Sequence, residues 1–242
     1  MHSKLGINPD NVLNLLKGQA FHEFPDNVVD RNRHFARLYY YTTKGWIERA
    51  KSCRDPEFLH LVVTHFYDLY DQYVLEPDKS RSTNTVHHWG VYRSIVGDSK
   101  VGPITLPKSI AVPFAVRAHI RYDLAEAICS ACHEYRDTHG CDPDLECFRD
   151  FIFGKKSSAI FRKACLDFFC ALSPSIARSS ALKTVFYLQS FLWMPAFQKS
   201  RRQAWREAQQ SLMSGKPIKR AFRYSEESTQ DTLLRQAGSL IT

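Results

Sequence analysis

Residues 55–77 read DPEFLHLVVTHFYDLYDQYVLEP, and this stretch decides the fold class. It opens on Asp55-Pro56, where an aspartate suits a helix N-cap and a proline suits the first helical turn. The apolar side chains that follow recur at steps of three and four residues: Leu59, Val62, Val63, Phe66, Leu69, Tyr70 and Tyr73. This spacing is typical of one face of a helix, so we expect a helix from Pro56 to near Pro77.

Helical periodicity continues on both sides of this stretch. It predicts further helices at residues 27–53, from 83 or 84 to 97, from about 109 to 136, and at 144–153, 157–172, 174–193 and 195–214. We expect a loop at 98–108, a kink of the fourth helix at Pro113, and a helix start at Pro195. No segment shows the alternation of a strand. The sequence therefore predicts an all-α protein.

The composition favours one domain with a large core. The 242 residues include 16 Phe and 11 Tyr, and 44% of the chain is apolar. No linker-like stretch and no repeat divides it. We therefore expect a multi-helix bundle over residues 1–223 with an internal, aromatic-lined cavity, followed by a mobile C-terminal tail at 224–242 that is rich in Ser, Thr and Gln.

The termini and the cysteines indicate the compartment. Residues 1–6 show no apolar stretch behind a basic start, and no window suggests a transmembrane segment. The seven cysteines lie at irregular positions, which is typical of reduced thiols. We expect a cytoplasmic protein.

Most of the net charge of +8 comes from one region, residues 199–223, which contains eight basic residues and a single acidic residue, Glu207. A solvated helix end and loop is the simpler interpretation, and contact with a polyanion or a membrane is the alternative. No nucleic-acid-binding motif accompanies the basic residues, so a nucleic-acid partner is not expected.

The candidate functional residues centre on His119 and Asp123. They are spaced i,i+4 on one helix face, among apolar neighbours such as Val116 and Leu124. A buried carboxylate needs a partner, and an imidazole oriented by a carboxylate is the arrangement used for general base chemistry. The pair is either a catalytic or ligand-binding site, or a polar clasp that ties two helices together.

Other polar residues on apolar helix faces extend this candidate site. His34 and His65 could join His119 and Asp123 in a zinc or iron site, although no cofactor is favoured. Tyrosine hydroxyls could add donors to the cavity or only pack: Tyr39, Tyr41, Tyr67, Tyr70, Tyr73 and Tyr122.

Cys129-Ser130-Ala131-Cys132-His133 matches a haem-attachment pattern but falls within a predicted helix in a chain without an export signal, so covalent haem is not expected. A zinc site that adds Cys141, Cys147 and His139 is an alternative, and ordinary buried thiols are favoured. The phosphate-binding loop, the dinucleotide fingerprint and the nucleophile elbow of serine hydrolases are all absent from the sequence.

The segment Arg117-Ala118-His119-Ile120-Arg121-Tyr122-Asp123-Leu124 resembles the Asn-Ala-His-Ile-Asn-x-Asp-Leu hallmark of an uncharacterised family, domain of unknown function 5995. Phe35 through Thr43 and Arg202 through Ala208 are similar to the early F-x-x-x-Y-x-x-x-T helix and the closing R-x-A-W-x-x-A helix of that family. The resemblance implies a helical fold and marks His119 and Asp123 as the shared polar pair. It brings no known reaction, and it does not cover His34 or His65.

The leading functional hypothesis is an enzyme that acts on a small, largely apolar substrate by cofactor-independent acid/base chemistry, such as a cyclase, isomerase or lyase. His119 would be the acid/base, oriented by Asp123, while Arg117 or Arg121 would contact an acidic group of the substrate. A metal-dependent hydrolase of phospholipase-like helical type, and a non-catalytic small-molecule or anion-binding module, are the alternatives. The sequence does not fix the oligomeric state.

Overall fold

The computed structural model describes residues 8–22, 28–75 and 111–218, together with positions 89, 92, 96, 100–101 and 104–105. The described helices, in chain order, are α1 (Pro9–Phe21), α2 (Val28–Ala50), α3 (Pro56–Tyr70), the π-helical turn η1 (Asp71–Leu75), α5 (Val112–Ala118), the π-helical turn η4 (His119–Asp123), α6 (Leu124–His139), α7 (Leu145–Phe153), α8 (Lys155–Leu172), α9 (Pro174–Arg178) and α10 (Ser180–Ser214). The prediction of an all-α fold is confirmed.

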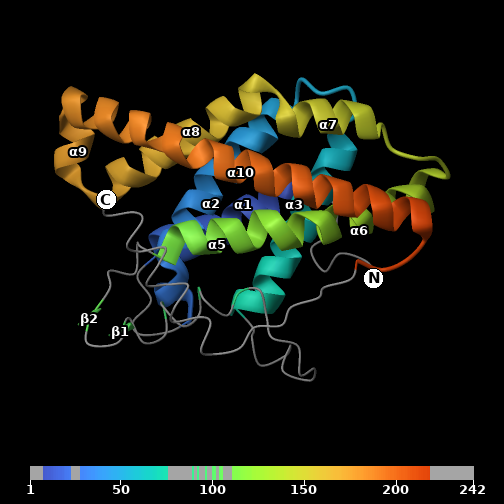
Figure 1. The fold of residues 1–242 in the computed structure, drawn as a ribbon, viewed down its shortest axis with the longest axis horizontal. Helices are drawn as coiled ribbons and strands as arrows, with labels where there is room; N and C mark the ends of the chain where they lie inside the picture. The colour runs from blue at the N-terminus through green and yellow to red at the C-terminus, as the bar shows by residue number, and fades with distance from the viewer. Residues whose placement is uncertain are drawn as a thin grey trace.

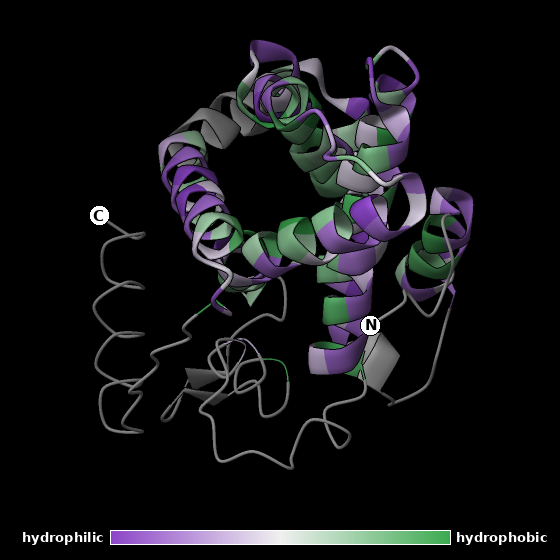
Figure 2. Cartoon of the chain, turned by 90° about the vertical axis from the view of Figure 1, so that its right-hand side faces the viewer, coloured by the Kyte–Doolittle hydropathy of each residue, from purple (hydrophilic) through white to green (hydrophobic). Residues whose placement is uncertain are grey.

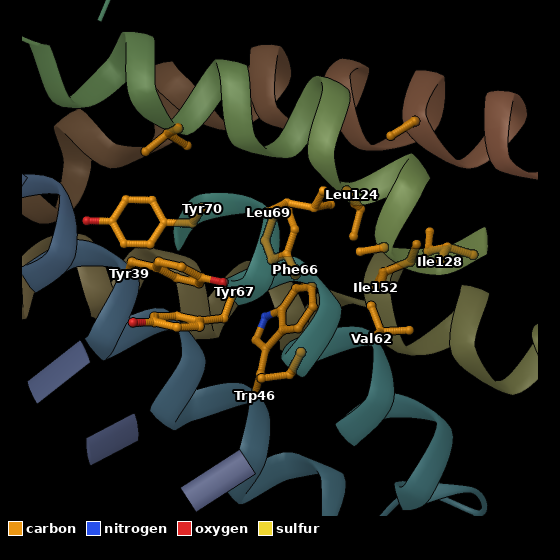
Figure 3. Packing of buried hydrophobic residues seen from close by; sticks show 14 of the residues in the cluster. Tyr39, Trp46, Val62, Phe66, Tyr67, Leu69, Tyr70, Leu124, Ile128 and Ile152 are labelled. Carbon is orange, nitrogen blue, oxygen red and sulfur yellow. The ribbon is translucent and has the colours of Figure 1, made fainter. Parts of the chain in front are cut away.

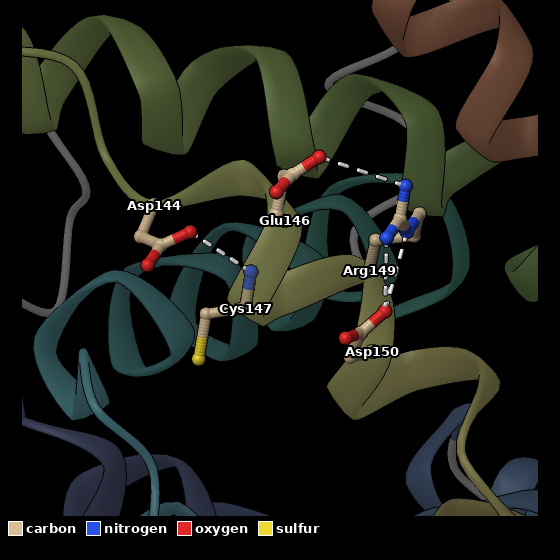
Figure 4. Close-up of polar contacts among 5 residues, drawn as sticks. All are labelled: Asp144, Glu146, Cys147, Arg149 and Asp150. Carbon is tan, nitrogen blue, oxygen red and sulfur yellow. Dashed lines mark hydrogen bonds and ion pairs between the residues drawn. The ribbon is translucent and has the colours of Figure 1, made fainter.

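Several helices begin at a side chain that caps the first turn. Asp55 Oδ1 accepts from the amide of Phe58 at 3.1 Å, as the Asp55-Pro56 signal predicts. Asp144 does the same for α7, where the Cys147 amide lies 2.9 Å from its carboxylate (Figure 4). The sequence analysis missed α1, although Asn8 ahead of Pro9 carries the same kind of cap signal.

The helices pack as a bundle around one core. α10 runs along the long axis of the molecule beside α8 and α6 (Figure 1), and α3 packs against α6. α2 packs against α1 and α8. Along these helices hydrophobic and hydrophilic stretches alternate (Figure 2), as amphipathic helices require. The core is rich in aromatic and aliphatic side chains from α2, α3 and α6 (Figure 3).

At two positions, proline has a different effect from the predicted one. Pro113 does not kink a helix, because it lies in the first turn of α5, where its missing amide hydrogen leaves no bond unmade. The predicted break at Pro195 is also wrong, since Pro195 lies inside α10. The boundary between α9 and α10 lies instead before Ser180, where the Ser179 hydroxyl accepts a hydrogen bond from the Leu182 amide at 3.2 Å.

Three other predictions concern segments that the structure describes only in part or not at all. The predicted loop at 98–108 contains a short antiparallel pair, β1 (Lys100–Val101) with β2 (Ile104–Thr105), which the sequence analysis did not find. Within the predicted helix ending at residue 97, only Trp89, Tyr92 and Val96 are described, and all three are buried. The predicted tail at 224–242 lies outside the described residues. In the described parts of the chain, no helix has the length and apolar character that crossing a bilayer requires.

Candidate functional site

His119 and Asp123 lie at the two ends of η4, the wider turn that joins α5 to α6. The amide of Leu124 bonds to the carbonyl oxygen of His119, five residues back, in place of the four-residue step of an α-helix. Such single π-turns inside α-helices occur frequently at functional sites. The local backbone therefore sets this pair apart from the rest of the long helix.

The pairing expected from the i,i+4 spacing is present. His119 Nδ1 lies 2.8 Å from Asp123 Oδ2, and the indole Nε1 of Trp89 donates to the same oxygen at 3.0 Å. The Asp123 side chain has no exposed surface and that of His119 has 4%. Because a buried carboxylate is costly unless it is bonded, these two contacts stabilise Asp123 in the core.

Aromatic rings surround the imidazole of His119. The ring of Phe66 stacks on it with centroids 3.5 Å apart and planes 10° apart, and Tyr39 meets it edge-on at 4.7 Å. Phe35, Tyr70 and Trp89 complete the enclosure, with centroids between 5.7 and 6.1 Å away. The imidazole is therefore held in one orientation by rings as well as by its hydrogen bond.

His119 lies in the wall of a cavity between α2, α3, α5, η4, α6, α8 and α10. The cavity has room for the centres of water-sized molecules over about 50 Å³, within an empty space of about 590 Å³ that includes volume open to solvent. The smaller volume, about 50 Å³, is enough for a few water molecules or one small organic group. The lining is mostly apolar: Phe35, Leu38, Tyr39, Thr42, Thr43, Trp46, Val63, Phe66, Val116, His119, Ile120, Leu124, Phe161 and Arg201.

Arg201, a charged residue of the lining, was not a candidate site residue in the sequence. It is 1% exposed, and its Nη1 donates to the Ile152 carbonyl at 3.3 Å and to the Ser157 hydroxyl at 3.5 Å. The guanidinium carbon lies 6.0 Å from the ring centroids of both Trp46 and Phe161. Burial lowers the pKa of Arg201 to about 10, so the guanidinium stays charged at neutral pH.

The interpretation of residues 199–223 as one solvated basic stretch is wrong at Arg201. This residue belongs to the buried face of α10, together with Phe197, Ala204 and Ala208. Their spacing of three and four residues was a usable signal in the sequence. Its neighbour Arg202 is exposed, as the solvated interpretation expects.

The structure places the two predicted substrate-binding arginines outside the cavity lining. Arg117 is exposed on α5. Arg121 makes two hydrogen bonds to Glu207 of α10, from Nη1 at 2.7 Å and from Nη2 at 2.6 Å. Its guanidinium also lies 5.0 Å from the ring centroid of Tyr122. Arg121 therefore joins two helices, and Tyr122, which is also absent from the lining, packs beneath it.

The histidines of the metal alternative also lie elsewhere. His65 Nε2 lies 2.8 Å from Glu134 Oε2 and so links α3 to α6. The ring of His34 packs edge-on against Phe168, with centroids 6.5 Å apart. The described residues contain no group of three or more His, Cys, Asp and Glu side chains placed to hold a metal ion. The structure therefore does not bring His34 and His65 into one ligand set with His119 and Asp123.

Of the six tyrosines that the sequence suggests for the cavity, one is in its lining. It is Tyr39, and Tyr70 lies behind it in the ring cluster around His119. Burial is the largest cause that raises the pKa of both hydroxyls far above the ordinary tyrosine value. Both phenols therefore remain protonated and can act as hydrogen-bond donors.

The seven cysteines differ in their exposure to solvent. All seven are free, and Cys129 and Cys132 are buried within α6 while His133 is exposed. Burial raises the pKa of Cys132 to about 12. Cys141 is exposed and Cys147 is half-buried in α7, so the structure assembles no zinc site from these cysteines and His139.

The fold and the site define an all-α bundle protein that holds a buried His–Asp pair against an aromatic-lined cavity. The family model described as "Family of unknown function (DUF5995)" matches residues 19–242. The chain therefore belongs to this family, in agreement with the resemblance found around His119. No curated protein and no solved structure matches the chain.

Proposed function

We propose that the protein is an enzyme that performs acid/base chemistry on a small, largely apolar molecule bound in the cavity. One observation carries the proposal: the imidazole in the cavity wall is bonded through Nδ1 to a buried carboxylate, 2.8 Å away. This is the arrangement by which a carboxylate orients a histidine for proton transfer.

Each member of the pair has a distinct role in this proposal. When Nδ1 donates to Asp123, the neutral imidazole presents Nε2 as its basic atom. Nε2 would take a proton from the substrate, and the charge of Asp123 would stabilise the imidazolium that forms. Returning the proton to another atom of the substrate gives an isomerisation or a cyclisation, and loss of a leaving group gives an elimination. The chemistry is therefore of cyclase, isomerase or lyase type.

The surroundings of His119 favour such a reaction over hydrolysis. The ring is enclosed by Phe66, Tyr39 and other aromatic side chains, which leave little room for bulk water once a ligand is bound. Aromatic faces also stabilise positive charge that develops on a substrate. The hydrolase considered from the sequence needs His34 and His65 beside His119, and their contacts with Phe168 and Glu134 hold them elsewhere.

The test compares the wild-type protein with a His119→Ala variant on a small-molecule extract of the cells that make the protein. Untargeted mass spectrometry should show a compound consumed by the wild type and a product formed from it. We expect the rate to fall by about 10²–10⁴ in the variant, the usual contribution of a general acid or base. His133→Ala is the matched control, because His133 is exposed on the continuation of the same helix.

Circular dichroism and melting curves must show that the variants are folded. If His119→Ala does not fold, His119→Gln replaces it, since its amide can still donate to Asp123 while it has no basic ring nitrogen. Equal turnover by the wild type and a folded His119 variant would refute acid/base catalysis by His119. Compounds that are retained by the protein but left unchanged would favour the non-catalytic binding module.

A further inference from the structure

The cavity contains a positive charge that no carboxylate of the described residues balances. Within the described residues, no carboxylate lies within ion-pair distance of Arg201, whose hydrogen bonds go to the Ile152 carbonyl and the Ser157 hydroxyl. Both come from Nη1 and both are long, so Nε and Nη2 make no hydrogen bond to the described part of the chain. Buried arginines without a carboxylate are costly, and the charge invites an anion from outside.

Two more donors line the same cavity. The Trp46 indole nitrogen and the Tyr39 hydroxyl are both buried, and neither has a hydrogen-bond partner in the described part of the structure. They lie seven residues apart on one face of α2, and both residues line the cavity. Indole donates only, and a guanidinium donates only. Thr42, also in the lining, gives its proton to the Leu38 carbonyl at 2.9 Å.

The lining therefore offers donors and one full positive charge, set in an apolar wall. We infer that the ligand of this cavity is a small organic acid, with an apolar body among the aromatic rings and a carboxylate paired with Arg201. The planar fork of a guanidinium matches a carboxylate in geometry as well as charge. This inference rests on the proposed function and specifies its substrate class: the acid group lies at Arg201 and the reacting atoms lie at His119.

A structural role for Arg201 is the competing account. Ile152 lies in the last turn of α7, where the carbonyl end of a helix favours a positive charge, and the rings of Trp46 and Phe161 add cation–π contacts. These contacts explain why the charge is tolerated. They do not explain the additional donors at Trp46 and Tyr39, which an incoming carboxylate would satisfy.

The test measures binding of isosteric acid and amide pairs: benzoate with benzamide, and 3-phenylpropionate with 3-phenylpropanamide. Titration calorimetry on the wild-type protein should show each acid binding at least about tenfold more tightly than its amide, the factor expected of one charge-assisted hydrogen bond. Arg201→Gln should abolish this preference. Arg202→Gln is the matched control, since it removes a neighbouring exposed charge from the same helix, and it should leave the preference unchanged.

A second variant keeps the test decisive if Arg201→Gln does not fold. Trp46→Phe keeps an aromatic ring and removes only the indole donor, so it should weaken the acids by about threefold to tenfold and leave the amides almost unchanged. A preference for the acid that survives both Arg201→Gln and Trp46→Phe would overturn the inference. So would an unchanged affinity for the acids in Trp46→Phe when it is the only variant that folds.

The outcomes also separate this inference from the proposed function. Equal binding of acid and amide by the wild type overturns the inference that the ligand is an acid. The proposed function is then still compatible with a neutral substrate. Acid binding that depends on Arg201, without turnover of any acid in the cell extract, supports the ligand class and counts against the enzyme. Failure of all four compounds to bind at millimolar concentration overturns the acidic ligand and leaves the proposed function to the turnover assay.

Discussion

Replacing Asp123 by Asn keeps the shape of the side chain and removes its charge. Oδ2 of Asp123 accepts two hydrogen bonds, from His119 Nδ1 at 2.8 Å and from Trp89 Nε1 at 3.0 Å. A hydrogen bond to a charged group contributes about 1.5–3 kcal/mol, and one between neutral groups about 0.5–1.5 kcal/mol. The asparagine oxygen can take the place of Oδ2, so both bonds remain and each weakens by about 1–1.5 kcal/mol. We therefore expect the free energy of unfolding to fall by about 2–3 kcal/mol.

Thermal unfolding followed by circular dichroism measures this change. For a chain of this size, a loss of about 2–3 kcal/mol lowers Tm by about 4–12 °C. Asp167→Asn is the matched control, because Asp167 pairs with Lys163 at 2.6 Å on the surface, where the side chains are 34% and 74% exposed. Such surface pairs contribute at most about 1 kcal/mol. A fall of less than about 2 °C in Asp123→Asn, or an equal fall in the control, would refute the reasoning.

Three further predictions test the packing. Gly45→Ala should lower the free energy of unfolding by about 1–3 kcal/mol in urea titrations, because its Cβ would lie 2.5 Å from Ile160 Cγ2, so that the Ile160 side chain or the helices α2 and α8 must shift; unchanged stability would contradict this contact. Pro195→Ala should raise Tm, since Pro195 is exposed inside α10 and a proline there costs up to about 3 kcal/mol relative to alanine; a lower Tm would show that α10 needs the local bend. Iodoacetamide at pH 8 should alkylate Cys141 and spare Cys132, whose pKa burial raises to about 12, as peptide mass spectrometry can check; rapid loss of the Cys132 thiol from the folded protein would oppose the packing of α6.

The helices could be predicted because their signals are local. Apolar spacing and cap residues such as Asp55 and Asp144 act within one or two turns, and the structure has both caps in place. The same locality explains the error at Pro195. A proline restricts its own turn, but whether a long helix continues through it depends on what that helix packs against.

The site was predictable only where its partners are near in sequence. His119 and Asp123 lie one turn apart, so their pairing follows from spacing alone. The contact of Trp89 with Asp123 spans 34 positions, and that of Arg121 with Glu207 spans 86, and neither has a sequence signal. Arg201 had a signal in its helical spacing, but the surrounding basic residues hid it because net charge along a stretch says nothing about which face is buried.

The π-turn at His119–Asp123 also has a consequence for the phase of the helix that carries it. An α-helix rotates by about 100° per residue, so one extra residue in a turn offsets everything after it by that angle. The segment before the turn, α5, contacts α2, whereas the segment after it, α6, contacts α3 and α10. Deleting one residue between Ala118 and Leu124 would restore a regular α-helix and rotate α6 away from α3. The turn thus rotates the apolar face of α6 relative to that of α5, so that one continuous helix can pack against α2 before the turn and against α3 after it.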